Sequence, residues 1–371
     1  MIRLTKPELG GAVDDIKTVL ETGFLVQGKK VRQFETLVAA YVGRKHGVAV
    51  NSGTSAIQCG LLSLGIGKGD DVIVPDFTFP ATANAVVSCG ATLVPADIDL
   101  STFNLDVHSF EAGLTSRTRA VMPVDLFGLA ADMEPIEDIC RQHGLILIED
   151  SACALGARYH DTRCGSFGKV SLLSFHPRKV VTTGEGGMVL TDDDEIAESV
   201  RRLRNHGIQI SEGRTDFVLA GYNMRMNEIE ACLGIAQMRQ IDDMIDRRRR
   251  IASLYDELLG DMEELEPPVA PEGYFHTYQS YVVMLDERIN RQVLMASMMD
   301  KGVETAIGTY SVHAQSFYRK TLGLEPGSVP QSYRAFNQSL ALPIYASMGE
   351  EAARSVADTL KECIPGAATG K

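Results

Sequence analysis

The chain lacks the sequence features of secreted and membrane proteins. Its seven cysteines are scattered, odd in number and without a CxxC pair, so neither a disulfide framework nor a zinc site is indicated. No apolar run approaches the roughly 20 residues that cross a membrane. The N-terminus MIRLTKPELGG has no apolar segment of the kind found in signal peptides. We therefore expect a protein of a reducing compartment, the cytoplasm, with no metal site.

Positive charge is also scarce. The 36 lysines and arginines are outnumbered by 49 aspartates and glutamates, which gives a net charge of −13. Nucleic acids and anionic membranes bind to concentrated positive charge, so we expect neither as a partner. Four consecutive arginines at 247–250 could form an anion site. The alternative, which we favour, is ordinary helix ion pairing, because Asp243 and Asp246 lie four residues before Arg247 and Arg250.

Helix and strand patterns alternate through the first half of the chain. Helices are predicted at 13–22, 30–42, 56–65, 81–90, 106–114 and 134–144. Strands are predicted at 47–50, 72–75, 91–98, 120–126, 145–150, 170–175 and 187–191. Such alternation is typical of βαβ units, so we expect a mostly parallel sheet with right-handed crossovers.

A second, smaller α+β domain is predicted towards the C-terminus. Residues 192–206 form a helical pattern that ends at a glycine, and 227–255 predict one long helix or two. The segment 266–277 is rich in proline and glycine and marks a boundary. Beyond it we predict strands at 279–285 and 303–307 and helices at 290–301 and 348–363. We assign residues 1–245 to a large domain and 246–371 to a small one.

Asn51-Ser52-Gly53-Thr54-Ser55-Ala56 follows a predicted strand and opens a helix. Backbone N–H groups and hydroxyls at the positive end of a helix dipole can hold a phosphate. An ordinary helix N-cap is an equally good interpretation. The segment is neither a Walker loop nor GxGxxG, so ATP and dinucleotides are not favoured.

Two charged residues stand next to predicted strands. Asp150 ends the apolar strand LILIED, at the sheet edge where such folds bind ligands, although a carboxylate there can also cap the next helix. Lys179 lies in a loop between two strands, where a solvated surface charge is the alternative. A phosphate cradle, a strand-end aspartate and a loop lysine together fit pyridoxal 5′-phosphate, which needs an anchor, a partner for its ring nitrogen and an amine.

Five segments resemble the DegT/DnrJ/EryC1/StrS family of sugar aminotransferases, which have fold type I. They occur in the family's order and are NSGTSAIQCGLLSLGIGKGDDVIVP, TFPATANAV, IEDSACALGARY, SFHPRKVVTTGEGG and GYNMRMNEIEACLG. The resemblance extends over nearly the whole chain and is densest in residues 30–245. It implies a large domain with a mixed, mostly parallel seven-stranded sheet flanked by helices, followed by the small domain.

The resemblance also implies roles for individual residues. Lys179 would be the lysine that forms the Schiff base and carries the proton, and Asp150 would pair with the pyridine nitrogen. Phe79 would stack on the ring. The phosphate would be held by Gly53, Thr54, Ser55 and Ser174. Asn223 would reach the phosphate from the neighbouring subunit, which implies a homodimer with composite active sites. The residues implied on the substrate side are His176, Arg225 and His313.

One position departs from the family. His or Gln usually stands three residues after the aspartate, whereas this chain has Cys153, and a thiol is a weak hydrogen-bond donor. The substitution puts the tuning of the cofactor's ring hydroxyl in question. Lys179 itself argues against the branch of the family that carries histidine there and dehydrates sugars.

The activity implied is a ping-pong transamination. L-glutamate would donate the amino group, and a nucleotide-linked 4-keto-6-deoxysugar would accept it, because GEGG after the lysine resembles the members that aminate C4. Two alternatives stay open. One is amination of another ketone such as an inosose, and the other is a cofactor-binding regulator without turnover.

Overall fold

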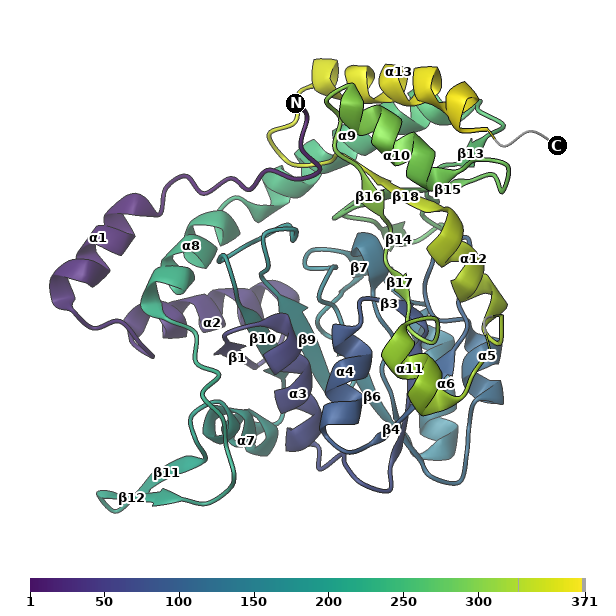
Figure 1. Cartoon of the computed structure of the whole chain (residues 1–371). Coiled ribbons are helices and arrows are strands. Elements are labelled where there is room, and N and C mark those ends of the chain that lie inside the picture. Colours follow the sequence, from purple (N-terminus) through teal and green to yellow (C-terminus); the bar gives the residue numbers. More distant parts are fainter. Residues whose placement is uncertain (326, 369–371) are drawn as a thin grey trace.

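The computed structural model describes residues 1–325 and 327–368. A central sheet with helices on its two faces forms the large domain, and a smaller lobe sits on one end of it (Figure 1). The sheet has the order β1-β10-β9-β6-β5-β2-β4. Its strands are β1 (His46–Val50), β2 (Asp71–Pro75), β4 (Thr92–Ala96), β5 (Thr118–Val121), β6 (Ile146–Asp150), β9 (Val170–Ser174) and β10 (Gly187–Thr191).

This sheet confirms the predicted architecture. β10 runs antiparallel to both of its neighbours, β1 and β9, and the remaining pairs are parallel. The seven predicted strands are all present. Because β1 and β9 both oppose β10, β1 points the same way as β9, β6, β5, β2 and β4. The carboxyl ends of six strands therefore lie at one edge of the sheet.

Helices cover both faces of the sheet, and the strand residues alternate between them. Leu172 and Ile148 pack in the cluster below α3 and α4, whereas their neighbours Leu173 and Leu147 pack on the opposite face. This is the two-residue period of a sheet buried on both sides. The helices are α2 (Lys29–Val42), α3 (Gly53–Ser63), α4 (Ala81–Ser88), α5 (Val107–Ala112), α6 (Met133–His143), α7 (Asp194–Leu203) and α8 (Glu228–Met238), with a 3-10 turn η1 (Leu126–Gly128).

Residues 227–255, for which one long helix or two were predicted, form two helices, because α8 ends before α9 (Ile241–Leu259) begins. The domain division at 245 falls inside α9. Ile241 and Ile245 belong to a core cluster of the large domain, and Ile251 and Tyr255 belong to the core of the small domain. A continuous helix therefore connects the two lobes.

The small domain is built on the sheet β13-β15-β18-β16. Its strands are β13 (Leu265–Glu266), β15 (Tyr281–Leu285), β16 (Ala306–Ile307) and β18 (Ser339–Leu342), and its helices are α10 (Arg291–Asp300), α12 (Pro330–Gln338) and α13 (Glu350–Ala367). The first residues of the chain also lie here, because Ile2 pairs with Val303 and the Leu4 N–H donates to the Glu304 carboxylate. The short helix α11 (Ser316–Leu322) instead packs on the large domain, where Tyr318 joins the core cluster and donates to Asn84 of α4.

Several elements were not predicted. One is the hairpin of β11 (Ile208–Ser211) and β12 (Arg214–Phe217), which projects from the body of the protein (Figure 1). The helix α1 (Val13–Thr22), which was predicted, projects as well. Three very short strands form a separate sheet, β14 (Tyr274–Phe275), β7 (Arg158–Tyr159) and β8 (Thr162–Arg163). A two-stranded ladder joins β3 (Phe77–Thr78) of the large domain to β17 (Tyr310–Ser311).

Three of the four consecutive arginines, 247, 248 and 249, bond to other groups of the protein itself. Arg247 pairs with Asp243 and with Glu8, both at 3.0 Å. The predicted pair of Asp246 and Arg250 is not formed among the described residues. Arg248 is only 3% exposed and donates to the backbone carbonyls of 278, 279 and 344, which ties α9 to the small domain. Within residues 1–325 and 327–368, no helix combines the length and the apolar character that a membrane crossing requires.

Candidate active site

The predicted motifs converge at the carboxyl edge of the central sheet. Asn51 follows β1, Asp150 ends β6, and Ser174 ends β9 immediately before the lysine loop. β6 and β9 are neighbours, with Asp150 opposite Leu172. Asp150 and Lys179 therefore share one edge of the sheet, as the cofactor hypothesis requires.

Lys179 lies in the loop between β9 and β10. Its backbone N–H donates to the His176 carbonyl at 2.8 Å, and its ammonium donates to the Cys153 sulfur at 2.9 Å. The side chain is half-buried and has no carboxylate partner in the described part of the chain. The predicted lysine is therefore neither a freely solvated surface charge nor part of an ion pair. Its amine is held beside the sheet edge.

Asp150 is 2% exposed, and both of its carboxylate oxygens accept hydrogen bonds. Oδ2 accepts from the Thr82 hydroxyl at 2.9 Å, and Oδ1 accepts from the Ala152 N–H at 3.1 Å. Burial raises the pKa of Asp150, whereas these hydrogen bonds and the charge of Lys179 lower it. The Ala152 bond closes a local turn, and the next element along the chain is the strand β7, so Asp150 does not cap a helix. Among the described residues, the carboxylate nevertheless has no bonded cation, and a buried carboxylate is stabilised by one.

The segment after β1 is a helix N-terminus with two N–H groups free. Ser52 is the N-cap of α3, its Oγ accepting from the Ser55 N–H at 3.1 Å. Gly53 and Thr54 have no backbone acceptor among the described residues. A Cβ on Gly53 would lie 2.7 Å from the Ser174 Cβ, so only glycine allows β9 to approach α3 this closely. The result is a small cradle at the positive end of a helix.

The two hydroxyl side chains of this cradle, Thr54 and Ser55, differ in exposure. Thr54 is exposed, whereas Ser55 is buried and its hydroxyl donates to Asn51 Oδ1 at 2.7 Å. The Ser55 hydroxyl is thus already used within the motif. Its phosphate role stays a prediction that requires the hydroxyl to turn away from Asn51.

Phe79 is an exposed aromatic ring beside the site. Its side chain is 62% exposed, although it directly follows the fully buried β3. Its ring meets Tyr310 of β17 edge to face at 6.2 Å between centroids. One turn further on, Thr82 of α4 reaches Asp150. An exposed ring three residues before the threonine that binds Asp150 suits the predicted stacking role.

Three of the residues predicted on the substrate and partner sides lie on different segments near the sheet edge. His176 is exposed in the lysine loop, and Arg225 donates to Asn205 Oδ1 at 2.6 Å. Asn223 is exposed two residues before Arg225, which pairs with Val50 at the end of β1. These three residues lie near the edge that holds the lysine. None contacts Lys179 or Asp150 through its side chain.

His313 differs from this pattern because it is fully buried. Its Nδ1 lies 2.8 Å from Asp76 Oδ2, and its N–H donates to Asp76 Oδ1 at 2.7 Å. The other ring nitrogen, Nε2, is buried without a hydrogen-bond partner. The geometry makes His313 part of the seam between β2 and the segment after β17. A substrate contact for it stays a prediction.

Sequence reasoning missed Thr82. It lies in TFPATANAV, four residues before the end of that motif, but nothing in the sequence shows that it reaches a carboxylate 68 residues away. Together, an amine, a buried carboxylate, a helix N-terminus and an open aromatic ring can bind a planar phosphorylated aldehyde. They can also hold a proton above it.

Comparisons with known proteins agree with this geometry. Residues 11–361 match the DegT/DnrJ/EryC1/StrS aminotransferase family. The chain is 36% identical over 368 residues to the spore coat polysaccharide biosynthesis protein SpsC of Bacillus subtilis (strain 168), covering 96% of this chain and 95% of the relative. It is 34% identical over 379 aligned positions to dTDP-4-dehydro-2,3,6-trideoxy-D-glucose 4-aminotransferase of Saccharopolyspora spinosa, covering 98% and 97%. The crystal structure of DesV from S. venezuelae has a TM-score of 0.89 and 32% identity, covering 97% and 98%.

Proposed function

The chain belongs to the DegT/DnrJ/EryC1/StrS aminotransferase family, and we propose that it is a pyridoxal phosphate-dependent enzyme that transfers an amino group from L-glutamate to a nucleotide-linked 4-keto-6-deoxysugar. The observation that carries the proposal is the shared edge of Lys179 and Asp150 beside the α3 N-terminus. The 4-aminotransferase among its relatives supports the sugar class.

The residues present fit the cofactor in three respects. Asp150 is a buried carboxylate without a bonded cation, which is what a protonated pyridine nitrogen would supply. The α3 N-terminus offers unpaired N–H groups at the positive end of a dipole. Phe79 exposes a ring face that an aromatic ligand would cover.

Each residue then has a defined task. Gly53 and Thr54 would hold the phosphate through their N–H groups, with the Ser174 hydroxyl beside them. Asp150, oriented by Thr82, would keep the ring nitrogen protonated, so that the bound cofactor supplies an electron sink. The Lys179 amine would bind the aldehyde carbon and, once displaced by the amino donor, move the proton from the donor's Cα. The exposed His176 lies in the same loop and is available to the sugar.

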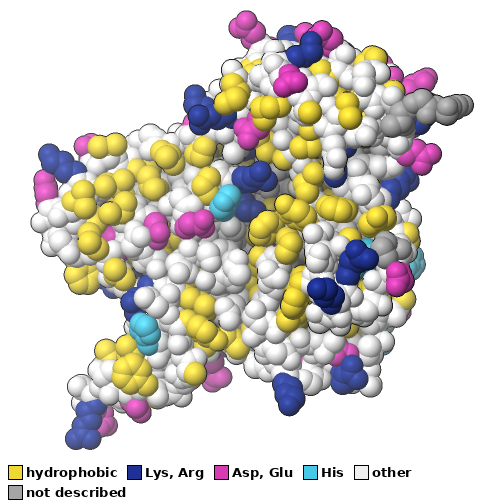
Figure 2. All heavy atoms as spheres, in the orientation of Figure 1, with side chains coloured by type: hydrophobic (Ala, Val, Ile, Leu, Met, Phe, Trp, Pro, Cys, Tyr) yellow, Lys and Arg dark blue, Asp and Glu magenta, His cyan; other side chains and the backbone are white. Residues whose placement is uncertain are grey.

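We also propose that the active form is a homodimer whose sites are shared between subunits. The loop at Phe24, Leu25 and Val26 exposes 61%, 44% and 43% of these apolar side chains. It lies beside the Asn223 segment, because Val26 pairs with Asn227. Figure 2 shows apolar side chains over the region of α1 and α8 and on the hairpin. Exposed apolar surface of this extent is typical of an interface.

The proposal is tested by absorbance and mass spectrometry. The purified protein with pyridoxal phosphate should show the visible band of a lysine-bound cofactor, and L-glutamate should replace that band with the band of the amine form. Lys179→Ala should show neither, while Lys301→Ala, a surface lysine paired with Glu362, should behave as the wild type. Normal turnover by Lys179→Ala would refute the assignment.

The acceptor is identified by screening UDP-, dTDP- and GDP-linked 4-keto sugars with the amine form and detecting the amino sugar by mass. Turnover with an inosose alone would identify the enzyme as a cyclitol aminotransferase. Binding of the cofactor without a reaction with any amino donor would identify a regulator.

A further inference from the structure

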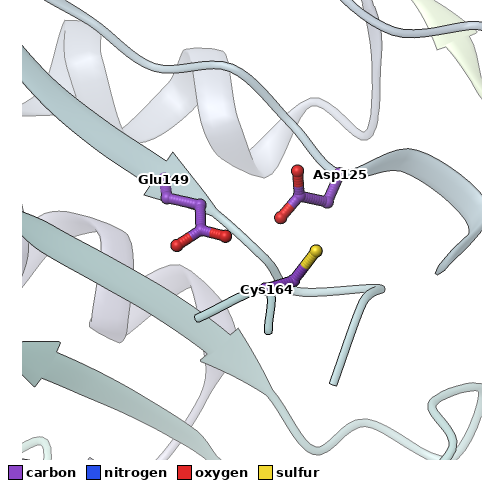
Figure 3. A group of neighbouring side chains, drawn as sticks. All are labelled: Asp125, Glu149 and Cys164. Carbon is purple, nitrogen blue, oxygen red and sulfur yellow. The ribbon is translucent and has the colours of Figure 1, made fainter. Parts of the chain in front are cut away.

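A second group of ionisable side chains lies directly behind Asp150. Asp125, Glu149 and Cys164 are all 0% exposed, and their ligand atoms lie within 4.8 Å of one another. Figure 3 shows the three side chains pointing towards one another, Glu149 from β6, Asp125 from the loop after β5 and Cys164 from the segment after β8. Neither carboxylate has a cationic partner among the described residues.

Main-chain donors surround both carboxylates, but unequally. Glu149 accepts from two backbone N–H groups, Gly165 at Oε1 (2.8 Å) and Phe167 at Oε2 (2.9 Å). Asp125 accepts from one backbone N–H, that of Ala131 at Oδ1 (2.9 Å), and from the Ser151 hydroxyl at Oδ2 (2.8 Å). Backbone donors are fixed, whereas a hydroxyl can turn and accept instead. A proton is therefore better placed on Asp125 than on Glu149.

Glu149 and Ser151, which both lie against the Asp125 carboxyl group, are the two chain neighbours of Asp150. The Asp125 N–H also donates to the Asp150 carbonyl at 3.0 Å. Asp125 thus bonds to the Ser151 hydroxyl and to the main chain of Asp150, and its carboxyl group lies close to that of Glu149. Two ionised carboxylates this close, both 0% exposed, would repel each other and loosen this end of β6.

We propose that Asp125 is a positioning residue that stays protonated, donates a hydrogen bond from its carboxyl O–H to Glu149, and so fixes the strand end that presents Asp150 to the cofactor. Burial and the neighbouring Glu149 carboxylate raise the pKa of Asp125 well above its ordinary value, in agreement with this assignment. The proposal rests on the proposed function for the role of Asp150, whereas the shared proton itself does not.

Two substitutions distinguish a proton on Asp125 from a proton on Glu149. Asp125→Asn keeps an oxygen for the Ala131 N–H and offers an N–H to Glu149, so it imitates the protonated acid. Glu149→Gln sets an NH₂ group against one of two backbone N–H groups and leaves that donor unpaired. We expect Asp125→Asn to keep the cofactor affinity within about threefold and Glu149→Gln to weaken it by roughly tenfold or more. Asp161→Asn, in the exposed turn between β7 and β8, is the control for the chemical change.

The decisive measurement is infrared spectroscopy of the full-length protein without cofactor or substrate. The wild type should show the carbonyl stretch of a buried protonated carboxylic acid at neutral pH, and Asp125→Asn should lack it while Asp161→Asn keeps it. Absence of the band in the wild type, its persistence in Asp125→Asn, or equal losses of affinity in both carboxyl variants would overturn the proposal. So would elemental analysis that finds a stoichiometric metal ion lost in Asp125→Asn, since a cation would then replace the proton. Because the infrared band needs no turnover, its absence is distinguishable from failure of the transaminase assignment.

Discussion

The ammonium of Lys179 donates to the sulfur of Cys153 at 2.9 Å. Cys153 is the position at which the family usually has His or Gln, and the structure places its thiol at the Lys179 amine. Both side chains are half-buried, so small reagents can reach them. The departure seen in the sequence therefore lies inside the site.

Cys153 should be the thiol that reacts first with iodoacetamide in the cofactor-free protein. Burial raises the pKa of Cys59 and Cys140 to about 12 and that of Cys89 to about 11, which keeps these thiols protonated. Peptide mapping should find the label on Cys153, and labelled protein should no longer bind pyridoxal phosphate. Cys153→Ser should be insensitive to the reagent and Cys89→Ser as sensitive as the wild type. Preferential labelling of Cys89 would contradict this expectation.

Thr82→Val should slow the reaction with L-glutamate by roughly tenfold or more, because the variant loses a hydrogen bond to a buried charge. The Thr82 hydroxyl lowers the pKa of Asp150, so its removal raises that pKa. The acid limb of the pH–rate profile should therefore move to higher pH. Stopped-flow absorbance across pH measures both effects. Thr36→Val, an exposed threonine on α2, is the control, and an unshifted acid limb in Thr82→Val would count against the role of this bond.

Mixed dimers should test whether sites are shared. If Asn223 serves the neighbouring subunit, Lys179→Ala and Asn223→Ala protomers that are mixed and allowed to exchange should form heterodimers with one complete site. Random pairing makes half of the dimers mixed, so activity should return to about a quarter of the wild-type value. If Asn223 acts within its own chain, each protomer is defective and mixing restores nothing.

The protein should lose stability in acid partly through His276. This ring is 2% exposed, and its Nδ1 accepts from the Tyr278 N–H at 2.9 Å, so burial keeps it neutral and lowers its pKa to about 3. Unfolded histidine titrates near 6.5, so the contribution is complete above that pH and is lost as pH falls towards 3. At about 1.4 kcal/mol per pKa unit, it amounts to roughly 5 kcal/mol at most.

His276→Asn should therefore unfold with a flatter pH dependence between neutral pH and pH ~4. Thermal unfolding across this range measures the slope. His108→Asn, which replaces an exposed histidine, should keep the wild-type slope. Parallel slopes for all three proteins would assign the acid sensitivity to other groups.

Much of the large domain could be predicted because its central strands are apolar on both faces and helices separate most of its strands along the chain. LILIED and VSLLSF each give a continuous apolar run, and each ends at the sheet edge that holds the site. The small domain was less predictable. β18 is a four-residue run, Ser339–Leu342, that pairs with β15 and β16 only after the chain has passed α11 and α12. No local pattern specifies that pairing.

The candidate site also has residues that the sequence could predict and residues that it could not. Asp150 and Lys179 could be found because strand ends and the loops between strands are visible in the sequence. Thr82 and Asp125 could not, since their closeness to Asp150 depends on the strand order β6-β5-β2, which the sequence does not state. The interior position of His313 also depends on a long-range contact, its bond to Asp76. Predicted roles at exposed residues such as Asn223 depend on a second chain.

The connection between the lobes bears on how the chain can be divided. α9 crosses from one core to the other, Arg248 binds three carbonyls of the small domain, and the first residues return to pair with Val303. A protease that nicks the proline-rich segment at 266–277 would thus produce two fragments that stay bound to each other. Split-protein reporters and chimaeras made by exchanging C-terminal thirds would have to carry residues 1–9 along with the exchanged piece.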